Sequence, residues 1–360
     1  MSTLDKIKKN SSVKESAILS KSKFFTNKDM ITTSVPIINV ALSGKLDGGL
    51  TPGLTMWAGP SKHFKTAFSL LMAKSYLDKY KDAALLFYDS EFGTPQSYFD
   101  SFGIDTNRVL HTPLTDIEQL KHDIMQQLTQ LERGDKLIIV VDSIGNLASK
   151  KEVDDAVEGK SVADMSRAKQ VKSLFRMVTP HLNLKDIPMV VVNHTYMEIG
   201  MFPKAIVGGG TGSYYSADNI FIIGRQQEKE GTEVVGYNFI INVEKSRYVK
   251  EKSKIPVTVS FDGGISRWSG LLDIAIESGH VIKPSNGWYS KVDKDTGEVE
   301  DKKYRIKDTD TKDFWMSIIT SKSFQTYVEE KYRVASAEIM QGGEEDLFDD
   351  VITMNGTENA

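Results

Sequence analysis

The 360-residue sequence contains no cysteine, which excludes disulfides and thiolate metal sites and fits a reducing cytoplasm. It also has no apolar run close to the roughly 20 residues that a membrane span needs. The basic start, MSTLDKIKKN, is not followed by the apolar segment of a secretory signal. The sequence therefore predicts a cytoplasmic protein with no membrane partner.

An excess of positive charge is absent too. The formal net charge is −4, so an electrostatic argument for nucleic-acid binding by the whole molecule fails. The charge is unevenly placed, because basic residues crowd into KSRYVKEKSK at 245–254 whereas no Lys or Arg follows Arg333. Any nucleic-acid binding must come from local patches, and the acidic end predicts a disordered tail over 336–360.

Apolar runs alternate with helical periodicity in the first half of the sequence. Helices are expected at about 65–80, 115–132 and 161–179. Buried strands are expected at LTMWAG (54–59), AALLFYDSE (83–91), KLIIVVDS (136–143) and IPMVVVNH (187–194). This alternation predicts an α/β fold, in which helices cover both faces of a mostly parallel sheet.

The flanking segments follow other patterns. SVKE at 12–15 predicts a capping box for a short N-terminal helix, and 22–53 has strand and turn character. NIFIIGR, YNFIINVEKS and KIPVTVSFDGG, between 219 and 264, predict strands that extend the sheet antiparallel. The predicted domains are an N-terminal segment (1–30), an α/β core (31–264), a small α+β C-terminal domain (265–335) and the acidic tail (336–360).

GPSKHFKT at 59–66 matches the phosphate-binding pattern G-x-x-x-x-G-K-[ST] except at its sixth position, where Phe64 replaces glycine. The stretch follows a strand and opens a helix, where backbone N–H groups attract phosphate oxygens. Lys65 would reach the β- and γ-phosphates, and the Thr66 hydroxyl would ligate Mg²⁺. Because Phe64 has a Cβ, we expect its backbone to avoid positive φ. The remaining loop residues are Gly59, Pro60, Ser61, Lys62 and His63.

The alternative to a phosphate-binding loop is a chance match to this short pattern. The residues at the ends of three other strands argue against a chance match. Asp142 ends one strand, Asp89 and Glu91 end another, and His194 ends a third. Ligands bind at the carboxyl ends of parallel strands. There Asp142 can hold Mg²⁺ through water, an acid at 89 or 91 can polarise the attacking water, and His194 can sense the γ-phosphate. Each residue alone is more often a cap or loop residue; together they favour a nucleotide site.

The motifs GPSKHFKT, FYDSEF, VVDSIGNLASKKE, VVVNH, VGGGTGSYYSADNIFIIGR and VEKSRYVKEKS follow the order and spacing of the RecA/Rad51 recombinases. The sequence most resembles the UvsX recombinases of T4-like phages, which share the bulky residue before the loop lysine. The resemblance covers about Ser22 to Arg333. It implies a RecA-like P-loop ATPase core and a DNA-dependent ATPase that uses ATP and Mg²⁺.

The resemblance further implies helical filaments on single-stranded DNA, with homologous duplex DNA as the second partner. Strand exchange would serve recombination, recombination-dependent replication and repair, in the host cytoplasm if the origin is a phage. A single-strand-binding protein and a loading mediator are further implied partners.

By position, Glu91 matches the water-activating glutamate, Tyr98 the aromatic that stacks on adenine, and Asp142 the Walker B acid. Lys65 and Thr66 match the P-loop pair. His194 stands where bacterial members carry a glutamine that senses the γ-phosphate. Lys245 and Arg247 match two catalytic basic residues that reach the ATP of the neighbouring subunit.

Two segments, about 147–163 and 197–216, match the DNA-binding loops of the family. In the second, glycines allow backbone N–H groups to approach phosphates closely, although a flexible loop without a ligand has the same composition. These glycines are Gly208, Gly209, Gly210 and Gly212. Arg167, Lys169 and Lys172 follow the first loop at helical spacing, either to contact phosphates or as a solvated face.

Two other functions stay open at this point. A ring helicase on the same core usually has an arginine finger and an extra N-terminal domain, whereas the segment before Gly59 is short. A non-catalytic DNA-binding accessory protein would not need Lys65, Thr66, Glu91 and Asp142.

Overall fold

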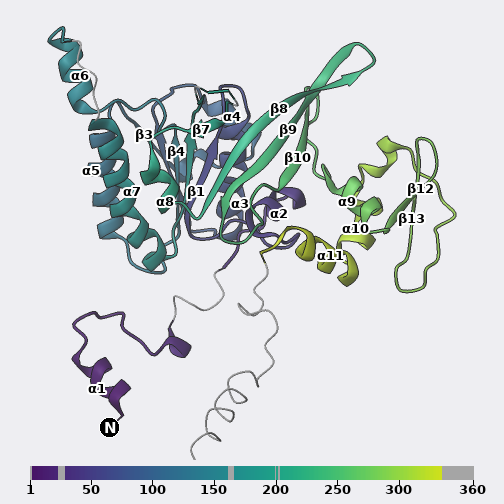
Figure 1. The fold of residues 1–360 in the computed structure, drawn as a ribbon, viewed down its shortest axis with the longest axis horizontal. Coiled ribbons are helices and arrows are strands. Elements are labelled where there is room, and N and C mark those ends of the chain that lie inside the picture. Colours follow the sequence, from purple (N-terminus) through teal and green to yellow (C-terminus); the bar gives the residue numbers. More distant parts are fainter. Residues whose placement is uncertain (1, 23–28, 161–165, 199, 202, 335–360) are drawn as a thin grey trace, which may run out of the picture.

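The structure is a computed structural model that describes residues 2–22, 29–160, 166–198, 200–201 and 203–334. Nine strands form one sheet in the order β11-β10-β9-β8-β1-β5-β4-β2-β3 (Figure 1). Their bounds are β1 Gly53–Ala58, β2 Ala84–Asp89, β3 Val109–Pro113, β4 Leu137–Asp142, β5 Pro188–Asn193, β8 Asn219–Glu230, β9 Glu233–Ser246, β10 Lys254–Ser260 and β11 Gly264–Ile265. The predicted acidic tail, 336–360, lies outside the described residues.

The half of the sheet from β8 to β3 is parallel. β1 pairs with β5 on one side and with β8 on the other, and β4 and β2 continue in the same direction. The predicted strands are confirmed. β3 was not predicted. It is the edge strand next to β2, and its residues are intermediate or exposed and form no apolar run.

The other half is antiparallel, as predicted. β8 and β9 form a long hairpin, β9 pairs with β10, and β10 pairs with β11. Figure 1 shows the hairpin reaching well beyond its neighbouring strands. β8 therefore joins the two halves, because it is parallel to β1 and antiparallel to β9.

Helices cover both faces of the sheet. Two apolar clusters hold them there, one containing Trp57 and Phe68, the other Met56 and Phe175. Neighbouring residues of β1 point to opposite faces, as a strand requires. The core helices are α2 Pro36–Ser43, α3 Lys65–Lys79, α4 Gln96–Ser101, α5 Ile117–Gln130, α6 Lys150–Val157, α7 Ser166–Lys185 and α8 Thr211–Ser216, with η2 Thr106–Arg108 and the small sheet of β6 Thr195–Met197 and β7 Ala205–Val207.

Two predictions for the N-terminal region were wrong. The first helix, α1 (Thr3–Asn10), is capped by Ser2 and Asp5, and 12–15 is not helical. A short 3-10 turn, η1 (Leu19–Lys21), follows it. The segment 22–53, expected to have strand and turn character, has an isolated bridge between Ile31 and Leu50 but also contains α2, which begins with Pro36 in its first turn and is buried from Ile37 to Ser43. Proline suits the first helical turn, and the packing of this apolar segment then favours the helix.

The C-terminal region packs around its own aromatic residues. Phe314 and Trp315 are buried, and Tyr304 and Trp268 contact them at ring-centroid distances of 4.9 and 6.3 Å. This mixed region agrees with the predicted fold class. Its elements are α9 Leu271–Glu277, β12 Val281–Ser285, β13 Trp288–Lys291, η3 Ile306–Thr309, α10 Lys312–Ile319 and α11 Lys322–Tyr332.

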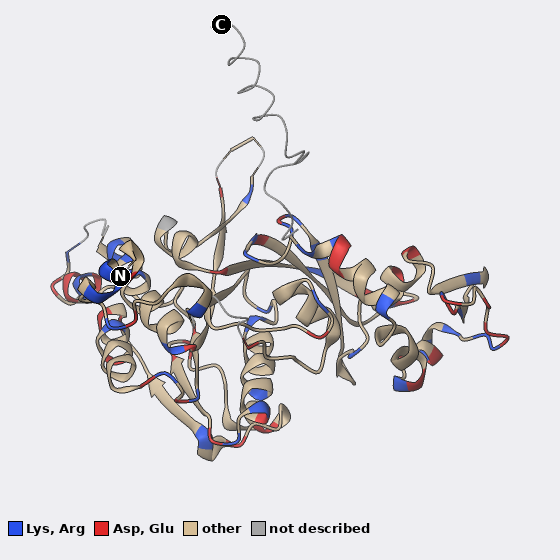
Figure 2. Cartoon of the chain, turned by 90° about the horizontal axis from the view of Figure 1, so that it is seen from below, with Lys and Arg blue, Asp and Glu red and all other residues tan. Residues whose placement is uncertain are grey.

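Charged residues of both signs are interspersed over the fold (Figure 2). Within the described ranges, no helix has the length and hydropathy needed to cross a membrane.

Candidate active site

The phosphate loop connects β1, which ends at Ala58, to α3, which begins at Lys65. The expectation that Phe64 avoids positive φ was wrong, because Phe64 has φ 61° and ψ 16°, in the left-handed region. Its ring stacks on Phe239 at 5.2 Å and meets the edge of Phe68 at 5.6 Å. Aromatic contacts of about 0.5–1.5 kcal/mol each offset the roughly 1–2 kcal/mol that a left-handed residue costs.

Lys65 and Thr66 begin α3 and point into the site. The Lys65 side chain donates to the Pro60 carbonyl at 2.7 Å, and the residue is only 6% exposed. Burial lowers the pKa of Lys65, while the carboxylates of Glu91 and Asp142 act in the opposite direction. The loop lysine is therefore held within electrostatic reach of Glu91 and Asp142, two of the three acids that the sequence singled out.

Thr66 and Asp142 form a second contact at this edge. The Thr66 hydroxyl donates to Oδ2 of Asp142 at 2.7 Å, whereas the buried Oδ1 accepts no hydrogen bond from the described part of the chain. Burial raises the pKa of Asp142 to about 6. A buried carboxylate oxygen without a donor, beside a hydroxyl, fits Mg²⁺, which prefers oxygen ligands.

No group of three or more His, Cys, Asp or Glu among the described residues can hold a metal. Mg²⁺ does not need such a group, because it usually takes one or two protein carboxylates and completes its shell with water and substrate phosphates.

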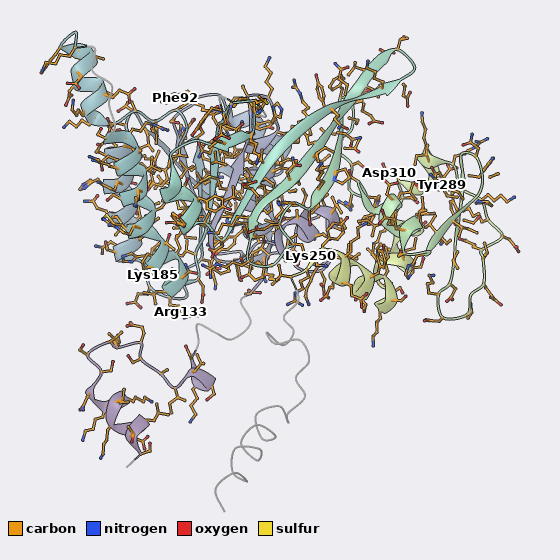
Figure 3. The ribbon with its side chains drawn as sticks, viewed as in Figure 1. Phe92, Arg133, Lys185, Lys250, Tyr289 and Asp310 are labelled. Carbon is orange, nitrogen blue, oxygen red and sulfur yellow. The ribbon has the colours of Figure 1, made fainter. Side chains whose placement is uncertain are left out.

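Asp89, the last residue of β2, and Glu91, two residues later, make different contacts. One oxygen of Asp89 accepts the N–H groups of Glu91 at 3.0 Å and Phe92 at 2.8 Å, and the other lies 3.2 Å from the His111 ring. Asp89 therefore shapes the turn that carries Glu91. Phe92, labelled in Figure 3, is exposed at this turn with φ 54°.

Glu91 and His194 contact each other across the site. Nε2 of His194 lies 3.0 Å from Oε1 of Glu91, and each side chain is 32% exposed. This hydrogen bond lowers the pKa of Glu91, a second one from Ser143 and the charge of Lys65 add to the effect, and burial opposes it. Glu91 is thus ionised at neutral pH and can accept a proton from water.

His194 also lies against a residue that precedes the first predicted DNA loop and a residue within the second. A Cβ on Gly145 would lie 2.4 Å from Cδ2 of the His194 ring, so a larger residue at 145 would have to displace that ring. The carbonyl of His194 accepts the N–H of Gly208 at 2.9 Å. His194 is therefore positioned between Glu91, the residue Gly145 before the first loop and the residue Gly208 within the second.

Tyr98 lies on α4 beside a cavity of about 1090 Å³ that Phe64, Phe102 and Ile265 also line. Its ring meets Phe102 edge-on at 5.5 Å, and burial raises the pKa of its hydroxyl. An aromatic face at the border of a cavity next to the phosphate loop suits a planar base.

The comparisons with known proteins agree with this geometry. A family profile described as "RecA N-terminal domain" matches residues 1–266. A second, described as "Bacteriophage T4, Recombination and repair protein, C-terminal domain", matches 268–328. The chain belongs to the RecA family. The predicted relationship to recombinases of the RecA family, and to their T4-like phage branch, is confirmed.

Three relatives illustrate the relationship. The chain is 49% identical to the "Recombination and repair protein" of Enterobacteria phage T4, over 94% of this chain and 89% of that protein. It is 27% identical to "Protein RecA" of Tropheryma whipplei (strain Twist), over 73% of this chain and 60% of that protein. It is 25% identical to "Protein RecA" of Synechococcus sp. (strain CC9902), over 76% of this chain and 70% of that protein.

The two predicted DNA loops of this RecA-family chain come after the strands that end at the site, β4 and β5. The first contains α6, and 161–165 lies outside the described residues. Arg167 donates to the carbonyls of Leu147, Ile144 and Gly145 at 2.7, 2.8 and 3.0 Å. Arg167 therefore holds the base of the first loop, a role that the helical spacing did not indicate, and a DNA contact by it stays a prediction.

Lys169 and Lys172 are exposed on α7, so both interpretations of them stay open. Packing accounts for the glycine at 212. A Cβ at this position would lie 2.6 Å from Cβ of Lys172, where α8 packs on α7. Gly209 and Gly210 have φ of 91° and 72°, which other residues rarely adopt.

Lys245 lies near the end of β9 and Arg247 directly follows that strand, both away from their own phosphate loop. Lys245 donates to the Tyr214 carbonyl at 2.6 Å, and Arg247 forms an ion pair with Asp218. Asp218 in turn accepts the N–H of Leu54, at the start of β1. The loop follows the opposite end of this six-residue strand, roughly 17 Å away at 3.3 Å per residue.

Proposed function

We propose that the chain is an ATP-dependent recombinase. It hydrolyses ATP with Mg²⁺, assembles as a helical filament on single-stranded DNA, and pairs that strand with homologous duplex DNA. The observation that carries the proposal is the convergence of Lys65, the Thr66–Asp142 pair and the Glu91–His194 pair at one edge of the sheet. Both predicted DNA loops leave the same edge.

Each residue has a distinct task in hydrolysis. Lys65 contacts the β- and γ-phosphates, and the loop amides bind phosphate oxygens. Thr66 and Asp142 would hold Mg²⁺, which neutralises charge on the phosphates when bound. Glu91 takes a proton from the water whose oxygen bonds to the γ-phosphorus, while the bond from that phosphorus to the ADP oxygen breaks. Tyr98 would stack on the adenine.

The partners follow from the same proposal. Exposed amides and basic side chains of the loops would contact the phosphates of single-stranded DNA, with little sequence preference. A single-strand-binding protein and a loading mediator would act on the filament, in the cytoplasm of a host cell.

A strand-exchange assay tests the proposed function. Circular single-stranded DNA is mixed with linear duplex DNA, ATP, Mg²⁺ and the full-length protein. We expect joint molecules only with homologous duplex and only with ATP. Equal product with a heterologous duplex, or no product under conditions where the protein coats the single strand, would contradict the proposal.

The His194 contacts predict that this residue couples nucleotide to DNA. His194→Ala is expected to keep ATP binding, since Lys65 and the loop amides remain. Wild type should bind DNA more tightly with a non-hydrolysable ATP analogue than with ADP, by the roughly 5- to 150-fold typical of coupled sites. His194→Ala should bring this ratio close to one. His194→Gln should keep part of it, because an amide can also donate to a phosphate.

DNA affinity in the two nucleotide states, measured for wild type and both variants, checks this prediction. Gly145→Ala offers an independent perturbation, because its methyl group would displace the His194 ring without removing it. An unchanged affinity ratio in His194→Ala would show that the histidine is only structural.

Lys245 and Arg247 are expected to act on the ATP of a neighbouring subunit. A protein with both residues changed to alanine should bind ATP as a monomer but lose most of its turnover, because its interface lacks the two cations. Mixing it with Lys65→Ala protein should restore activity, since some mixed interfaces combine one intact half from each. If co-assembled mixtures show no more turnover than either variant alone, the shared site is wrong.

A further inference from the structure

Arg225 joins the β8–β9 hairpin to the phosphate loop. Its Nη1 donates to the Lys62 carbonyl at 3.2 Å, and its guanidinium lies over the ring of Tyr237 at 4.7 Å. The ring lies on β9, so it fixes the direction of the guanidinium from the neighbouring strand. A planar guanidinium suits this combination of stacking and donation better than an ammonium does.

The same hairpin holds the loop at a second point. Phe64 stacks on Phe239 at 5.2 Å, and Phe239 is the register partner of Arg225. Lys62 and Phe64, both at φ 61°, are the loop residues other than glycine with left-handed backbone. Each is therefore held by one member of a single cross-strand pair.

We propose that Arg225 is a positioning residue for the phosphate loop, with the β8–β9 hairpin as its brace. Left-handed backbone at Lys62 and Phe64 turns successive N–H groups toward one concave face, which suits phosphate oxygens. Side chains with a Cβ disfavour that conformation, so an outside contact has to stabilise it. Arg225 does so at Lys62, as Phe239 does at Phe64. The inference rests on the proposed ATP binding.

This arrangement explains how the loop functions without its usual last glycine. A glycine adopts left-handed backbone freely, whereas Phe64 does so because the hairpin binds its ring. Contacts from the β8–β9 hairpin thus stabilise a backbone conformation that glycine would adopt without them. Arg225 is expected to affect how tightly the nucleotide binds rather than how fast the bound nucleotide reacts.

The experiment uses full-length protein and compares wild type with Arg225→Ala, Arg225→Lys and Lys229→Ala. Lys229 is an exposed cation on the same strand and serves as the matched control for charge. The first measurement is amide hydrogen exchange without nucleotide over residues 59–68, where the N–H groups of Gly59 and Phe68 donate to the carbonyls of Asn193 and Phe64. The second is steady-state ATPase kinetics. Melting temperatures within about 2 °C of wild type would show intact folding, as for most surface substitutions.

In Arg225→Ala, exchange over the loop should rise about tenfold because the braced conformation opens more often. The KM for ATP should rise about tenfold, the loss expected for one charge-assisted hydrogen bond, with kcat within about twofold of wild type. Arg225→Lys should show smaller increases in loop exchange and in KM than Arg225→Ala does. Lys229→Ala should match wild type in both measurements.

Unchanged exchange and KM in Arg225→Ala would overturn the proposal. Equal changes in Lys229→Ala would overturn it too, because they would show that the overall charge of the hairpin, and not the Arg225 contacts, causes the effect. A wild type that does not hydrolyse ATP would instead overturn the proposed function. The exchange measurement still tests the brace in that case, because it needs no nucleotide.

Discussion

A Lys65→Ala variant is expected to show no ATP turnover above background, with or without single-stranded DNA. The ammonium group lies in a buried position at the loop, where it can contact the β- and γ-phosphates. Alanine also removes the cation that lowers the pKa of both Glu91 and Asp142. The variant therefore loses the charge partner of the phosphates, and the two neighbouring acids lose one nearby positive charge.

Phosphate release measures this prediction, with two companion variants. Lys65→Arg keeps the charge but should regain little activity, because the larger planar group does not fit the place of an ammonium. Lys81→Ala removes an exposed lysine that follows the same helix and should behave as wild type. DNA-stimulated turnover in Lys65→Ala would refute the assignment of the phosphate loop.

Glu91→Gln is expected to slow ATP hydrolysis on the order of 10²-fold or more, the loss typical of a missing general base. Glutamine has the same shape, so it can still accept from His194 and leave the turn at Asp89 intact. It cannot take a proton from water. ATP affinity should therefore remain, and filaments on DNA should last longer because ATP persists.

Single-turnover kinetics separate the two effects, because they report the chemical step after ATP has bound. Asp100→Asn, which neutralises an exposed carboxylate on nearby α4, is the matched control. Near-normal turnover in Glu91→Gln would show that another group activates the water.

The central part of the fold and site could be predicted because its signals are local. Buried parallel strands are continuous apolar runs, and each one ends at the sheet edge where Lys65, Glu91, Asp142 and His194 gather. The edge strand β3 has no such run, since only one of its sides pairs within the sheet. The helix α2 was missed because its apolar segment also resembles a strand.

Other features depend on contacts between residues far apart in the sequence. The left-handed backbone of Phe64 is accompanied by stacking on the ring of Phe239, which no local pattern places beside it. The pairing of His194 with Glu91 joins residues 103 positions apart. Arg167 sits at helical spacing with exposed lysines, yet its guanidinium binds carbonyls of the chain. These contacts depend on tertiary packing, which cannot be read from composition or periodicity.

Electron microscopy of the full-length protein with single-stranded DNA and ATP tests the central claim most directly. The account predicts open helical filaments that form with ATP or a non-hydrolysable analogue and that Lys65→Ala fails to form with ATP. It also predicts that Glu91→Gln filaments persist after wild-type filaments have disassembled. Closed rings threaded by DNA, or filaments that form equally well without nucleotide, would contradict it.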